Sequence, residues 1–87
     1  MRLAKFRAKH MAKLQELKQR LLSQYPDKKE RIEYICDLLM AKLQNLRSHT
    51  LADYLFTLHL ATKEFPELKE LIPPTKEIEE MLDAEGG

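Results

Sequence analysis

Residues 51–64 read LADYLFTLHLATKE, and this stretch decides the fold. Its leucine, alanine and aromatic residues predict a helix with almost no polar face. Pro66 limits that helix at its end, because proline removes a backbone hydrogen bond and clashes with the preceding turn. A helix of this composition must be covered on more than one side, either by the rest of the chain or by a second subunit.

Two longer amphipathic helices are predicted before this stretch, over residues 2–24 and about 28–47. Each places apolar side chains at spacings of three and four, which is the period of one helical face. The apolar stripe of the first helix contains Leu3, Phe6, His10, Leu14, Leu17 and Leu21. The stripe of the second helix contains Ile32, Ile35, Cys36, Leu39, Leu43 and Leu46. The short connection after residue 47 makes the second and third helices antiparallel or sharply angled neighbours.

Side chains with the spacing of N-terminal capping boxes precede two of these helices. Asp27 with Glu30 predicts the start of the second helix, and Thr50 with Asp53 predicts the start of the third. In such a box, each side chain accepts a hydrogen bond from a backbone N–H that the helix leaves unpaired.

The chain beyond residue 64 predicts one or two short helices, because apolar ridges stand on both sides of Pro73 and Pro74. The whole sequence contains sixteen Leu, four Ile and no Val, a composition that favours helices over strands. We therefore predict one all-α domain over residues 1–87, with a frayed tail at 83–87. Its core consists of three helices at about 2–24, 28–47 and 51–64.

The formal net charge of +1 conceals opposite charges at the two ends of the chain. Residues 1–24 carry seven Lys or Arg and one Glu, a net +6, whereas residues 64–87 carry two Lys and eight acidic residues, a net −6. The basic face of the first helix consists of Arg2, Lys5, Lys9, Lys13 and Arg20. This face has three interpretations: it binds nucleic-acid phosphates, it pairs with the acidic C-terminal segment within one chain or across a dimer, or it is an ordinary solvated surface.

No motif for catalysis, a cofactor or a metal is recognisable. Both glycines stand at the C-terminus, so there is no Gly-rich phosphate loop, and His10, His49 and His59 lack the spacing of local metal motifs. The single cysteine, Cys36, lies on an apolar stripe and predicts a buried thiol. His10 lies on an apolar stripe too, where we expect a hydrogen-bonded interface histidine. We accordingly expect no enzyme.

We expect the chain to act by binding, as an adaptor or accessory protein that makes protein–protein contacts and forms a homodimer or small oligomer. The predicted interface consists of Leu51, Leu55, Phe56, Leu58, Leu60, Leu68, Leu71 and Ile72. The alternative is a sequence-tolerant nucleic-acid-binding protein that uses the basic face. In a hybrid of the two, residues 75–87 compete with nucleic acid for that face.

Two further expectations concern the surroundings of the protein. Binding to a membrane is not expected, because so small a domain needs the apolar stripe of its first helix for the core. A cytoplasmic location is expected, because the N-terminal residues lack the apolar run of a signal peptide and one cysteine forms no intrachain disulfide.

Overall fold

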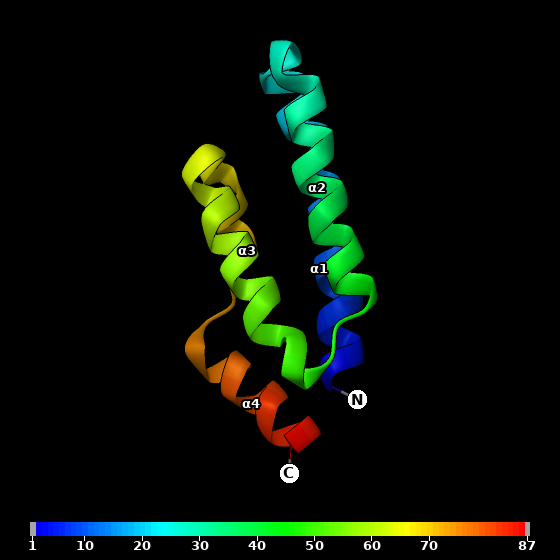
Figure 1. Cartoon of the computed structure of the whole chain (residues 1–87), viewed down its shortest axis with the longest axis vertical. Helices are drawn as coiled ribbons and strands as arrows, with labels where there is room; N and C mark the ends of the chain where they lie inside the picture. The colour runs from blue at the N-terminus through cyan, green and yellow to red at the C-terminus, as the bar shows by residue number, and fades with distance from the viewer. Residues whose placement is uncertain (1, 87) are drawn as a thin grey trace.

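The chain folds into four α-helices joined by short 3-10 turns, as Figure 1 shows for the computed structural model. The structure describes the backbone of residues 2–86 and the side chains of residues 3–82. The α-helices are α1 (Arg2–Gln24), α2 (Lys29–Gln44), α3 (Leu51–Glu64) and α4 (Thr75–Gly86). The 3-10 turns are η1 (Pro26–Lys28), η2 (Ser48–Thr50) and η3 (Pro66–Leu71). Residues 2–86 contain no strand, so the predicted all-α fold is confirmed.

Helices α1 and α2 lie side by side along the longest axis of the molecule, and α3 diverges from α2 (Figure 1). The chain reverses direction at Tyr25 and η1, because Pro26 disfavours helical geometry in the residue before it. η3 contacts both α3 and α1, and α4 lies across the end of the bundle beside the N-terminal part of α1. The molecule is elongated, with extents of 45 × 20 × 16 Å.

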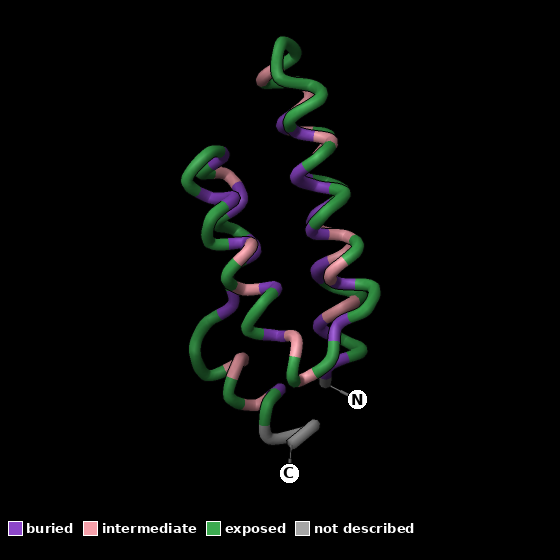
Figure 2. The backbone as a smooth tube through the Cα atoms, viewed as in Figure 1, coloured by how far each residue is buried: buried purple, intermediate pink, exposed green. Residues whose placement is uncertain are grey.

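The core lies where α1, α2, α3 and η3 meet, and Figure 2 shows buried residues along the inward sides of these elements. The apolar stripes predicted for the first two helices are buried throughout. η3 adds Leu68 and Leu71, which pack between α1 and α3. The C-terminal segment of the same chain therefore covers one side of α3.

Both predicted capping boxes are wrong. Lys28 occupies the N-cap position of α2 and makes no side-chain capping hydrogen bond there. Thr50 occupies the N-cap position of α3, but its hydroxyl accepts a hydrogen bond from the backbone N–H of Arg47 at 2.8 Å and so closes η2. Each helix follows a 3-10 turn, and this turn removes the extended backbone that a capping residue normally adopts.

α2 ends at Gln44, earlier than the predicted limit near residue 47. The Asn45 side chain donates a hydrogen bond to the carbonyl of Ala41 at 3.0 Å, which closes the last turn. Leu46 is still buried in the core, although it lies outside the helix. Its carbonyl accepts a hydrogen bond from Arg7 Nη2 at 3.0 Å, so the N-terminal part of α1 is tied to the end of α2.

α4 packs onto α1 through the buried Met81, with Ile78 partly buried beside it. Its first turn is closed by the backbone N–H groups of residues 77 and 78, which donate to the carbonyl of Pro74 at 3.0 and 3.2 Å. The predicted frayed tail, residues 83–87, lies outside the residues whose side chains are described.

Candidate functional site

Half of the predicted interface residues belong to the core. Leu51, Leu58, Leu68 and Leu71 are at most 1% exposed, so we correct the prediction that they form a contact surface. They are buried because η3 folds back onto α3 and α1. Leu55 is half-buried against the same core. The sequence alone could not separate these residues from exposed ones, because α3 is apolar on nearly every side.

Two predicted interface residues of α3 are exposed on its outer side, and two residues of α2 join them. Phe56 is 63% and Leu60 47% exposed, one helical turn apart, while Tyr34 is 61% and Leu38 38% exposed. Tyr34, Leu38 and Leu60 line one groove of about 170 Å³ between the helices. We call these four side chains the α2/α3 face. The sequence analysis assigned neither Tyr34 nor Leu38 to the interface, although their spacing of four puts both on one side of α2.

Two ion pairs join α2 to α3 toward the two ends of these helices. Arg31 Nε donates to the two carboxylate oxygens of Glu64 at 3.0 and 2.8 Å, and its guanidinium lies 5.5 Å from the ring centroid of Tyr34. Lys42 pairs with Asp53 near the other end. The hydrogen bond to Glu64 raises the pKa of Arg31. One ion pair therefore lies toward each end of the apolar α2/α3 face.

The predicted basic face of α1 is partly neutralised by η3. Glu70 of η3 pairs with Lys13 Nζ at 3.0 Å and accepts a hydrogen bond from Arg20 Nη1 at 2.7 Å. Glu16 lies 3.2 Å from Arg20 and 3.9 Å from Lys13. Hydrogen bonds from Lys13 and Arg20 lower the pKa of Glu70. We call these four residues the Glu70 cluster, in which two positive charges face two negative charges.

The rest of the basic face lies toward the N-terminus of α1. Lys5 and Lys9 are exposed, and Glu77 and Glu80 of α4 line the same hollow as they do. The side chain of Arg2 lies outside the described residues. Ion pairs with the C-terminal part of the chain are thus found for Lys13 and Arg20, whereas Lys5 and Lys9 share a hollow with acidic residues of α4.

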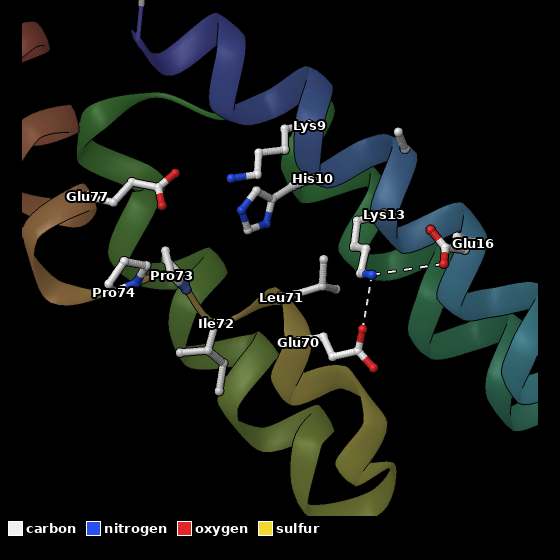
Figure 3. Close-up of a pocket in the computed structure, with 11 residues that line it drawn as sticks. Lys9, His10, Lys13, Glu16, Glu70, Leu71, Ile72, Pro73, Pro74 and Glu77 are labelled. Atoms are coloured by element: carbon white, nitrogen blue, oxygen red, sulfur yellow. Dashed lines mark ion pairs between the residues drawn. The ribbon is translucent and has the colours of Figure 1, made fainter.

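A pocket of about 450 Å³ opens between α1, η3 and the first turn of α4 (Figure 3). His10 forms part of its wall, and its ring stacks on Phe6 with the centroids 3.9 Å apart. In Figure 3, the charged ends of Lys9 and Glu77 lie on the same side of the pocket as the imidazole. Ile72, the remaining predicted interface residue, is 42% exposed and lines this pocket, not the α2/α3 face. We call it the His10 pocket.

His10 is only 6% exposed. Burial, and to a smaller extent the charge of Lys9, lowers the pKa of His10 to about 4. Its Nδ1 atom is buried and has no hydrogen-bond partner. The prediction of a hydrogen-bonded interface histidine is therefore wrong for this nitrogen, because the ring lies against an aromatic ring and not against a polar group.

Cys36 is fully buried, as predicted, and burial raises the pKa of its thiol to about 11. A protonated thiol is a poor nucleophile, so Cys36 is a core residue. Within the described residues, no group of three or more His, Cys, Asp or Glu is placed to hold a metal ion. No helix in that part of the chain combines the length and the apolar run that crossing a bilayer requires.

Comparisons with models of protein families, with curated protein sequences and with solved structures found no match for the chain. Three surface features of the molecule remain as indications of its function: the α2/α3 face, the Glu70 cluster and the His10 pocket. Only the first of them exposes a group of large apolar side chains.

Proposed function

We propose that the protein is a non-enzymatic helical adaptor that binds a helix of a partner protein through the α2/α3 face. The observation that carries this proposal is the exposure of four large apolar side chains on two neighbouring helices. Apolar residues scattered singly over a surface need no explanation, whereas a group of them around one groove is typical of protein-binding sites. The partner is a protein because the face offers apolar contact area and little hydrogen-bonding chemistry.

The geometry of the α2/α3 face suits an amphipathic helix. Such a helix presents apolar side chains at spacings of three and four, and these can enter the groove between Leu38 and Leu60. Covering the exposed part of each large apolar side chain contributes about 1 kcal/mol to binding. The ion pairs Arg31–Glu64 and Lys42–Asp53 add polar groups toward the two ends, where charged residues of the partner can set its direction.

The test uses Leu60→Glu and a matched control, Leu82→Glu. Both residues are exposed leucines, at 47% and 43%, but Leu82 lies on α4, away from the α2/α3 face. Sedimentation equilibrium first shows whether the wild type self-associates. If the wild type self-associates, the partner is a second copy of this chain. We then expect Leu60→Glu to be monomeric and Leu82→Glu to self-associate like the wild type.

If the wild type is monomeric, the same three proteins are used for affinity capture, followed by titration with the purified captured protein. We expect Leu60→Glu to bind at least about tenfold more weakly than Leu82→Glu, because a buried carboxylate without a partner is costly. Circular dichroism confirms that both variants keep their helical content. Equal binding by Leu60→Glu and the wild type would contradict the proposal.

Nucleic-acid binding by the basic face is the second candidate, and the exposure of Lys5 and Lys9 favours it. Because the Glu70 cluster occupies Lys13 and Arg20, two phosphate contacts are the most that we expect from the described side chains of this face. The slope of log affinity against log salt should then be about −2 for duplex DNA, measured by fluorescence anisotropy. A slope of about −4 or steeper would show that the Glu70 cluster opens on binding and would favour this candidate.

A further inference from the structure

The His10 pocket has the features of a small-ligand site, which the adaptor proposal does not use. Its volume of about 450 Å³ falls in the range of roughly 300–1,000 Å³ that is common for small-molecule sites. His10 lines it while being only 6% exposed, and its Nδ1 has no hydrogen-bond partner. Most buried polar atoms in native proteins are paired, so an unpaired one in the wall of a pocket needs an explanation.

Some charged side chains of the His10 pocket form ion pairs within the protein, and others do not. Lys13, Glu16 and Glu70 are engaged in the Glu70 cluster. Among the described residues, no ion pair is found for Lys9 or Glu77, and both line the pocket together with His10 (Figure 3). One positive and one negative group are therefore available to a ligand, with a neutral imidazole close to them.

The imidazole of His10 adds a hydrogen-bond donor to this pair. A neutral imidazole carries one proton, on either Nδ1 or Nε2. A proton on Nδ1 would leave a buried N–H unpaired, whereas a proton on Nε2 leaves only a lone pair unpaired at Nδ1. Proteins avoid unpaired buried N–H groups more strictly than unpaired acceptors, so Nε2 carries the proton and is the donor available to a ligand.

We propose that the His10 pocket binds a free α-amino acid with an apolar side chain. Its carboxylate accepts hydrogen bonds from Lys9 Nζ and His10 Nε2, and its ammonium group pairs with Glu77. Pro73 and Pro74 form the apolar wall that contacts its side chain. A simple anion would be repelled by Glu77 and a simple cation by Lys9, so a zwitterion matches both charges.

The first test is an NMR titration of the ¹⁵N-labelled protein with L-leucine at neutral pH. L-leucinamide, which lacks the carboxylate, and isocaproate, which lacks the ammonium group, serve as matched probes of similar shape. We expect saturable shifts around the pocket with millimolar leucine, and affinities about tenfold lower for each analogue, because each loses one charged interaction. If leucine causes no saturable shift, or isocaproate binds as tightly as leucine, the proposal is overturned.

Variants then assign the site. Lys9→Gln and Glu77→Gln should each weaken leucine binding about tenfold. Lys63→Gln and Glu79→Gln change exposed residues outside the pocket and should bind leucine like the wild type. Leu60→Glu should do so too, which keeps this inference independent of the α2/α3 face. Wild-type affinity in both pocket variants, with folding verified by circular dichroism, would show that leucine binds elsewhere.

Discussion

The apolar side chains of α3 are covered on one side of the helix and exposed on another. On the side of α1, η3 folds back and buries Leu68 and Leu71, and the Glu70 cluster holds η3 to α1. On the side of α2, the apolar residues of the α2/α3 face stay exposed between two ion pairs. The first side is covered by the chain itself, whereas the second leaves large apolar side chains exposed to solvent.

The largest effect is expected from truncating a leucine on the closed side. Leu68→Ala should lower the free energy of unfolding by about 3 kcal/mol, because it removes a fully buried side chain and leaves a cavity. Leu60→Ala, the same change on the open side, should cost less than about 1 kcal/mol, because Leu60 is 47% exposed. Urea denaturation of both variants measures the difference. Similar losses would mean that α3 is equally covered on both sides.

An intermediate effect is expected from pH, through His10. The pKa of His10 is lowered from 6.5 to about 4 in the folded protein. As the pH drops, His10 is therefore protonated in the unfolded chain before it is protonated in the folded one. The free energy of unfolding falls accordingly between about pH 6.5 and pH 4. The loss should reach about 2 kcal/mol by pH 5, and His10→Gln should lack it. The charged groups that line the pocket with the ring are Lys9, Lys13 and Glu16 of α1, Glu70 of η3 and Glu77 of α4, and both proteins keep them.

The measurement for this prediction is urea denaturation across the pH range, with His59→Gln as the control. His59 is exposed on α3, so its replacement should leave the pH profile of the wild type unchanged. An NMR titration of the imidazole locates its protonation directly. A profile for His10→Gln that is as steep as that of the wild type would show that other groups cause the loss.

The smallest effect on stability is expected from Glu70→Gln. It removes the carboxylate shared by Lys13 and Arg20, whose ion pairs are partly exposed, so the destabilisation should be slight at low salt and vanish at high salt. The same variant removes one of the two carboxylates that pair with Lys13 and Arg20, which makes these cations more available to a polyanion. Its salt slope for duplex DNA should be steeper than that of the wild type by about 1 to 2, as measured by anisotropy. An unchanged slope would show that Lys13 and Arg20 do not reach phosphates.

The C-terminal ends of α1 and α3 can be predicted from the sequence because local residues determine them. Pro26 and Pro66 act on the residues next to them and do not depend on the rest of the fold. The buried stripes of α1 and α2 are also predictable, because a helix with one apolar face has only one way to bury it.

The candidate sites are less predictable because they depend on tertiary contacts. No periodicity could show that Phe56 is exposed and Leu58 buried, since η3 decides which side of α3 is covered. The Glu70 cluster joins residues that are as far apart in the chain as Arg20 and Glu70. The capping boxes failed for a related reason, because the 3-10 turns that precede α2 and α3 alter the backbone at the cap.

The burial of Cys36 turns the one thiol of the chain into a natural reporter of opening motions. Its sulfur lies on the inward side of α2, so a thiol reagent can reach it only when the bundle transiently separates. In the limit of fast reclosing, the labelling rate is proportional to the population of the open form. The unmodified protein therefore allows its conformational fluctuations to be timed by mass spectrometry, without an engineered cysteine or a fluorescent dye.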